Sequence, residues 1–257
     1  MPRLPLPIAA LLCLSACRID PGMALEPVLQ RPRMATTTET AAIGTLQSEV
    51  GMNWDPGNSL SIPGIWRFGL TERSEAFIGG DTWRWDFDRD VNGPGNLLIG
   101  YRHRIIDHDG KFPAIAIQSE TKLPTAQKED QFGTEVVDWK FAVIVDQYID
   151  DTHVSLFNQA GYLSEADGGG TDFEWTLAGS LQKFLDKRWS WYFEGVSVRI
   201  SEQDYDARYM GTGFHYRLDS GALLDVALAA GFRGTRLEEH MLLFGYTRNV
   251  GAFYRLR

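Results

Sequence analysis

His153 and Ser155 are the residues of this sequence whose types and spacing best suit catalysis. Side chains two positions apart on a β-strand point to the same face, so the imidazole could take the hydroxyl proton and activate the serine oxygen. A third group must orient the histidine, and Asp151 lies two residues before it. Such a site would suit lipid hydrolysis. The competing interpretation is a polar strand face without a catalytic role.

The segment Asp88–Gly93, DRDVNG, matches the first half of a calcium-binding loop, with three oxygen-bearing side chains at alternate positions before a glycine. The glutamate that completes such a loop should follow six residues later, where Ile99 stands. We therefore favour a solvated turn held by its own Asp and Asn side chains. The sequence predicts no metal site and no cofactor.

Charged and bulky apolar residues alternate in many segments. In 137–146, Trp139 and Phe141 alternate with Asp138 and Lys140. A period of two is typical of a β-strand whose faces meet different environments. If the apolar face meets lipid, the charged face meets the lumen of a barrel. The candidate pore-lining residues are Arg67, Arg84, Arg102, Arg104, Glu120, Lys122, Asp138, Lys140, Asp225 and Arg248.

Two roles remain open for these charges. Opposite charges in a narrow lumen can create a transverse field that selects solutes. Alternatively, the charges pair with one another, because a small barrel fills its interior with polar groups that must satisfy each other.

Strands account for the chain from about residue 40 onward, where no convincing amphipathic helix is found. We expect twelve strands, beginning near residues 44, 63, 76, 97, 112, 136, 153, 173, 189, 209, 222 and 241. Long and short connections alternate, and the expected long ones are 54–62, 86–96, 124–135, 163–174, 201–208 and 233–240. Long outer loops and short periplasmic turns are typical of a bacterial outer-membrane barrel.

A soluble β-sandwich would also alternate, because one face of each sheet packs on a core. The regular difference between long and short connections favours the barrel, as do the aromatic residues near strand ends. We therefore predict an all-β fold: a closed antiparallel transmembrane β-barrel of about twelve strands over residues 40–257.

Residues 1–24 have the layout of a secretory signal peptide, with a basic residue before an apolar stretch and small residues after it. Cleavage is expected either at Cys17, which would then be lipidated, or after Ala24. Neither outcome leaves a cysteine pair for a disulfide, since Cys13 is removed in both. Residues 25–39, which follow, are expected to be a linker, either exposed or plug-like.

The 257 residues carry a formal net charge of −9 and are 44% hydrophobic. This apolar content excludes a wholly disordered chain. The acidity argues against a general nucleic-acid binder, which needs a basic face for phosphates. Most of the excess acid falls in the expected long loops, and the strands are mildly basic.

The segment 66–75, WRFGLTERSE, resembles an early hairpin of the outer-membrane barrel family named for the MetA pathway of phenol degradation. Similar stretches keep the family's order along the chain: 31–32, 38–41, 44–49, 100–102, 113–117, 122–125, 224–227 and 244–246. The sequence departs from the family at Ala126, where a glycine is usual. It also departs at the C-terminus, because such barrels commonly end in an aromatic residue and this chain ends in Arg257.

The resemblance implies a protein that passes small, often hydrophobic, compounds. We expect an exported barrel in a Gram-negative outer membrane, not an enzyme, that acts as a porin-like channel or transporter for small organic compounds, hydrophobic and aromatic ones included. The expected partners are outer-membrane lipid, these solutes and the barrel-assembly machinery, and no nucleic acid. The alternatives are a lipid hydrolase that uses His153 and Ser155, and a closed structural or adhesive barrel.

Overall fold

The computed structural model describes residues 27–31, 33–126, 132, 136–164, 171–201, 205–233 and 240–253. The expected signal peptide, with both cleavage positions Cys17 and Ala24, lies outside the described residues, as does the C-terminal end after Phe253. Within the described ranges, no helix is long and apolar enough to cross a membrane.

The described chain is built from β-strands. They are β1 (Thr45–Asp55), β2 (Ser59–Thr71), β3 (Ser74–Asp86), β4 (Val91–Gly93), β5 (Leu97–Ile106), β6 (Ala114–Leu123), β7 (Asp138–Ile149), β8 (Thr152–Ser164), β9 (Thr171–Phe184), β10 (Trp189–Ile200), β11 (Tyr205–Arg217), β12 (Leu223–Arg233) and β13 (His240–Ala252). The three-residue β4 pairs with the end of β3 and was not predicted.

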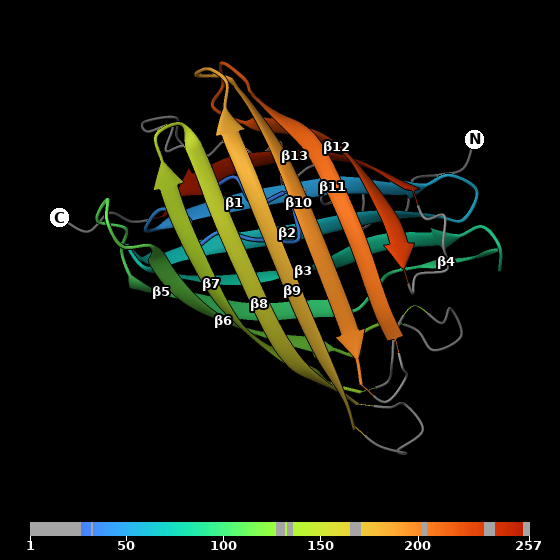
Figure 1. Ribbon diagram of the computed structural model, residues 1–257. Helices are drawn as coiled ribbons and strands as arrows, with labels where there is room; N and C mark the ends of the chain where they lie inside the picture. The colour runs from blue at the N-terminus through green and yellow to red at the C-terminus, as the bar shows by residue number, and fades with distance from the viewer. Residues whose placement is uncertain are drawn as a thin grey trace.

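The other twelve strands form one closed ring (Figure 1). Neighbours in the ring are antiparallel, and β1 closes it by pairing with β2 on one side and with β13 on the other. Closure gives the main-chain groups of each of these strands a partner on both sides, so no long edge is left open. The predicted closed antiparallel barrel of twelve strands is confirmed.

The first connection is shorter than expected. The sequence predicted a long connection over 54–62, but Trp54 pairs with Leu60 and only residues 56–58 join β1 to β2. Gly57, with a φ of 91°, permits this tight turn. The prediction was wrong because proline and glycine here mark a turn within a hairpin and not a longer loop. We call the barrel end that carries 56–58 and 87–96 the loop end, and the opposite end the turn end.

Apolar side chains form a belt around the outside of the barrel. In β7, Trp139, Phe141 and Val143 are exposed, whereas Asp138 and Ala142 on the other face are buried. The predicted alternation of faces in this strand is therefore observed. Other exposed belt residues are Ile78, Ile99, Ile117, Leu156, Leu181, Phe193, Met210, Val226, Leu228 and Phe244.

Aromatic side chains gather near both rims of the belt. At the loop end, Tyr162 packs edge-on against Phe173, with ring centroids 5.7 Å apart. At the turn end, Trp189 contacts Tyr216 at 4.6 Å, and Arg188 donates a hydrogen bond to the Tyr216 hydroxyl. Two aromatic rims flanking an apolar band are the arrangement by which barrels sit in a bilayer.

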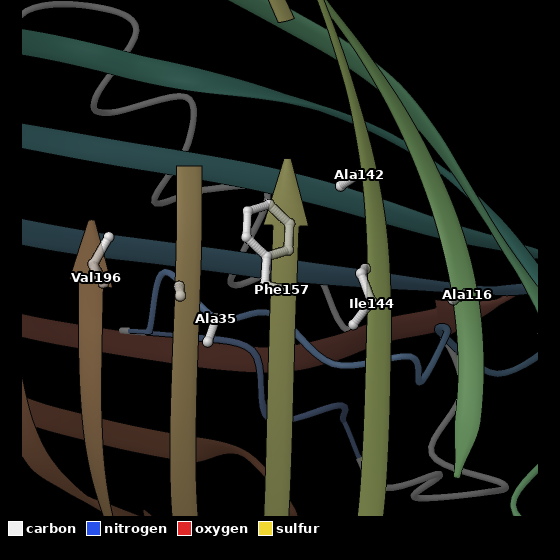
Figure 2. Packing of buried hydrophobic residues seen from close by; sticks show 7 residues of the cluster. Ala35, Ala116, Ala142, Ile144, Phe157 and Val196 are labelled. Atoms are coloured by element: carbon white, nitrogen blue, oxygen red, sulfur yellow. The ribbon is translucent and has the colours of Figure 1, made fainter. Parts of the chain in front are cut away.

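The chain before β1 runs inside the ring. We call residues 27–44, of which Pro32 is not described, the inner segment. Most of its described residues are buried. Ala35 packs against the inward side chains Phe157 and Ile144, in an apolar cluster on the β6–β10 wall (Figure 2). The sequence left an exposed linker and a plug-like leader open for residues 25–39, and the burial of the described part fits the plug-like form.

The outer belt predicts how stability depends on depth. Val143 lies near the middle of β7 and Ile149 at its turn end, and both are exposed on the belt side. We expect Val143→Arg to destabilise the folded barrel in vesicles by about 2–4 kcal/mol, and Ile149→Arg by no more than about 1 kcal/mol, because charge is tolerated near the interface. Urea unfolding of both variants in lipid checks this. Equal costs at the two positions would contradict a lipid-facing belt.

Candidate functional site

The lumen is occupied by the inner segment, which is attached mainly through its own main chain. Glu194, on β10, accepts hydrogen bonds from the main-chain N–H groups of Met34 at 2.9 Å and Ala35 at 3.2 Å. Both bonds reach the same carboxylate oxygen, Oε2. An anionic acceptor makes such bonds stronger than those between neutral groups. Glu194 therefore anchors this part of the inner segment to the wall.

Two more carboxylates repeat this contact. Asp146, on β7, accepts from the main-chain N–H of Thr38 at 2.5 Å. Glu75, on β3, accepts from the main-chain N–H of Ala41 at 2.7 Å. The three acidic residues come from widely spaced strands, so together they hold the inner segment against opposite parts of the wall.

Neutral and cationic side chains complete the attachment. Gln47 accepts from the N–H of Val28 at 2.8 Å and donates to its carbonyl at 3.2 Å. Arg102 donates to the carbonyl of Glu39 at 3.1 Å and to the hydroxyl of Thr36 at 2.9 Å. The main chain of the inner segment thus finds partners in the wall as a strand would in a sheet.

A buried charge network lies behind this attachment. Arg67 donates to Glu49 at 2.5 Å and to Glu75 at 2.9 Å, and Arg102 lies 3.5 Å from the same Glu75 oxygen. All four side chains are almost fully buried. Removing one member of such a network leaves a buried charge uncompensated, which costs about 3–5 kcal/mol. The network makes this side of the wall rigid.

Other candidate pore-lining residues also point inward and pair within the wall. Lys122 forms an ion pair with Asp138, and Lys140 pairs with Glu174 at 2.5 Å. Glu120 lies opposite Lys140 in the sheet register and shares its inward face. These charges sit on neighbouring strands toward the loop end.

The remaining inward candidates are more scattered. Arg84 lies 3.5 Å from Asp81 at the loop end, and Arg104 pairs with Asp107 at 2.7 Å near the turn end. Asp225 is opposite Gly245 in the register. A side chain at Gly245 would collide with the Asp225 carboxylate, since an added Cβ would be 2.2 Å from it. The glycine therefore makes room for this buried acid.

Arg248 does not face the lumen. Glu49 is inward and pairs with Thr247, whereas Arg248 pairs with Ser48 on the opposite face. The prediction that Arg248 points inward is corrected by this register. The error arose because large apolar residues occupy both faces of β13, so the sequence does not reveal which face is which.

The pair suggested for hydrolysis is present but arranged differently. His153 and Ser155 share the inward face of β8, and both are buried. Asp146 lies between them: the Ser155 hydroxyl is 2.5 Å from one of its oxygens, and His153 Nε2 is 3.4 Å from the other. No hydrogen bond joins the serine to the histidine among the described contacts. The imidazole is therefore not placed to take the serine proton.

Asp151 does not orient the histidine either. It lies in the turn after β7, where Lys183 donates to its carboxylate. That hydrogen bond lowers the pKa of Asp151 below the usual value for aspartate. His153 instead stacks on Tyr148, with ring centroids 4.4 Å apart. The environment is that of a structural polar cluster against the inner segment.

The half-match to a calcium loop forms a turn. Arg89 donates from its main chain to Asp86 Oδ1 at 2.9 Å and from its side chain to Asp86 Oδ2 at 2.7 Å. Asp90 adopts a positive φ of 52° there. In the described part of the chain, no three His, Cys, Asp or Glu side chains come together as metal ligands would.

Sequence reasoning missed the residues that hold the inner segment. Asp146 was recoverable, because a two-residue turn after Ile149 sets the β7–β8 register and places Asp146 opposite Ser155. Glu194 had no such signal. Its partners, Met34 and Ala35, are 160 and 159 positions away in the chain.

Two cavities lie on either side of the inner segment. The loop-end cavity has a volume of about 410 Å³ and reaches from Arg33 to Phe132 and Arg84. The turn-end cavity has about 200 Å³ and reaches from Arg33 to Phe184. Arg33 lines both, so the inner segment lies between the two spaces.

Solved outer-membrane proteins share this architecture at low sequence identity. An outer-membrane channel from Pseudomonas putida F1 matches with a TM-score of 0.62 and 12% identity, covering 90% of this chain and 100% of that one. The fold is that of an outer-membrane barrel. The NanC porin matches at a TM-score of 0.58 and 10% identity, covering 82% of this chain and 100% of that one. The KdgM porin matches at 0.56 and 10%, covering 79% and 98%.

Sequence comparison with protein families and with curated proteins finds no match. The likeness is therefore one of architecture, shared at low identity with porins and a channel.

The geometry predicts the outcome of a hydrolysis assay. We expect purified, folded protein to release no fatty acid from phospholipid vesicles, and Ser155→Ala to leave the trace unchanged, because the serine hydroxyl bonds Asp146 and not the histidine that would have to take its proton. Release that disappears in Ser155→Ala would restore the hydrolase alternative.

Proposed function

We propose that this protein is an outer-membrane channel that lets small organic compounds pass between the loop end and the turn end. The observation that carries this proposal is the pair of cavities on either side of Arg33. What separates them is the inner segment, which is attached to the wall mainly by hydrogen bonds with side chains. Among its described residues, it joins the sheet through the bridge between Ile43 and Gly69. The architecture shared with porins and a channel supports the same role at a coarse level.

The inner segment would act as the constriction of the channel. It is attached through acceptors such as Glu194, Asp146 and Glu75, each bonded to one or two main-chain N–H groups. A hydrogen bond to a charged group contributes about 1.5–3 kcal/mol. A few such bonds can be broken and remade, whereas the surrounding sheet stays intact. Passage then needs movement of the inner segment alone, and no chemistry.

The solutes we propose are small and include hydrophobic and aromatic compounds. Apolar side chains line part of the loop-end cavity, Ile65, Leu98 and Phe132 among them. The resemblance to the family named for the MetA pathway of phenol degradation is consistent with this class. Export by the N-terminal leader, contact with outer-membrane lipid and folding by the barrel-assembly machinery belong to the same proposal.

Liposome swelling with neutral solutes of graded size tests the channel. We expect swelling with small solutes and a sharp fall as size increases. Folded protein that causes no swelling and no bilayer conductance would favour the closed structural or adhesive barrel.

The constriction has its own test. Glu194→Ala removes the acceptor of two N–H groups of the inner segment. We expect open events in a planar bilayer to become at least tenfold more frequent, because the loss of even one such bond, about 1.5–3 kcal/mol, corresponds to a factor of ten or more. Glu174→Ala is the matched control, because it removes a lumen carboxylate that bonds Lys140 on the wall. Equal effects from both variants would refute a role for the inner segment in gating.

A further inference from the structure

The loop-end cavity is lined by more positive than negative side chains. Five cationic residues reach it: Arg31, Arg33, Arg67, Arg84 and Lys122. Two carboxylates, Glu49 and Asp81, also line it. An unequal lining of this kind attracts anions, provided that the cations are not neutralised by partners behind the surface.

Three of the five cations have such partners. Arg67 is bonded to Glu49 and Glu75, Lys122 is paired with Asp138, and Arg84 lies near Asp81. Their charge is largely compensated by the wall itself.

Arg31 and Arg33 of the inner segment differ from these. Among the described residues, neither has a carboxylate within ion-pair distance. Arg33 is only 7% exposed, and its guanidinium donates to neutral oxygens: the Leu29 carbonyl at 2.7 Å and the Ser180 hydroxyl at 3.3 Å. The Nε atoms of both arginines are buried without a hydrogen-bond partner. A buried N–H group without an acceptor costs free energy, so an anionic ligand that brings an acceptor to these arginines would be favoured.

Nearby acids attract both arginines without bonding them. Glu194 and Asp146 attract Arg33 electrostatically. Asp81 and Asp225 attract Arg31 in the same way. The oxygens of Glu194 and Asp146, however, accept hydrogen bonds from main-chain N–H groups of the inner segment. The acids that hold the inner segment are thus not in contact with its guanidinium groups.

The wall is shaped to keep the Arg31 guanidinium at the cavity. Its terminal nitrogen lies over Gly51, where an added Cβ would be only 2.0 Å away. In the sheet, Gly51 pairs with Gly245, and the Asp225 carboxylate lies over Gly245 beside the guanidinium. Arg31 also donates weakly to the Phe244 carbonyl, at 3.4 Å.

The rest of the cavity is suited to an apolar ring. Phe132 is buried there, with the Arg84 guanidinium 5.3 Å from its ring centroid. Pro63, Ile65 and Leu98 add further apolar surface. A volume of about 410 Å³ is within the usual range for a site that encloses a small organic molecule.

We propose that the loop-end cavity is a binding site for a small aromatic carboxylate, whose carboxylate bonds Arg31 and Arg33 and whose ring packs against Phe132. A planar guanidinium matches a carboxylate with two parallel hydrogen bonds. This inference rests on the proposed channel and names its solute class. A solute held here would lie on the loop-end side of the inner segment.

Binding of benzoate to the folded full-length protein in detergent, measured by calorimetry, tests the site. Benzyl alcohol has the same ring without the charge, and acetate has the charge without the ring. We expect benzoate to bind and each of the other two to bind at least tenfold more weakly. Equal binding of benzoate and benzyl alcohol would overturn the proposal, as would equal binding of benzoate and acetate.

Variants locate the binding. Arg31→Gln and Arg33→Gln should each weaken benzoate binding roughly tenfold to a hundredfold, as the loss of a charged hydrogen bond implies. Phe132→Ala should weaken benzoate and leave acetate unchanged. Arg188→Gln is the matched control, because this arginine is exposed at the turn end. Heat-modifiable migration reports whether each variant folds, and unchanged benzoate affinity in folded Arg31→Gln and Arg33→Gln would refute the site.

The proposed binding site and the proposed channel can be refuted independently of each other. Swelling with neutral solutes, without benzoate binding, would leave the channel standing and remove the site. Benzoate binding that depends on Arg31 and Arg33, without swelling or conductance, would keep the site and remove the channel.

Discussion

Buried main-chain N–H groups need acceptors, and in this barrel carboxylates of the wall supply them. A chain that lies inside a closed ring cannot pair with an edge strand, because the ring has none to offer. Glu194, Asp146 and Glu75 take the place of strand carbonyls. The path of the inner segment depends on these bonds between side-chain carboxylates and main-chain N–H groups. The two cavities and the separation between them depend on the same bonds.

The same interaction accounts for the charge pattern of the lumen. A carboxylate that bonds an N–H group keeps its charge, and its position is set by that bond, so it need not contact a guanidinium group directly. Glu75 does both, because it accepts from Ala41 and pairs with Arg67. Glu194 serves the inner segment alone, and Arg33 is left with neutral oxygens. The lining of the larger cavity therefore includes two arginines of the inner segment that, among the described residues, no carboxylate contacts directly.

The strands of the barrel wall could be predicted from the sequence far better than the position and contacts of the inner segment. Period-two alternation is local, so segments such as Trp139–Phe141 indicated both a strand and its faces. Where both faces are apolar, as around Arg248, the same rule failed. The inner segment was beyond local rules, because its bonds to Asp146 and Glu194 join residues 108 to 160 positions apart. Such bonds depend on the finished ring, and no short stretch of chain encodes them.

The described part of the inner segment begins and ends near the turn end. Its first described residues, Pro27 to Leu29, line the turn-end cavity, and its last residues join β1 at that end. Between these ends, Gln30, Arg31 and Thr36 line the loop-end cavity, so the described stretch folds back within the lumen. The pairings between neighbouring strands close the ring without it. Emptying the lumen would therefore break hydrogen bonds to wall side chains and leave the sheet closed.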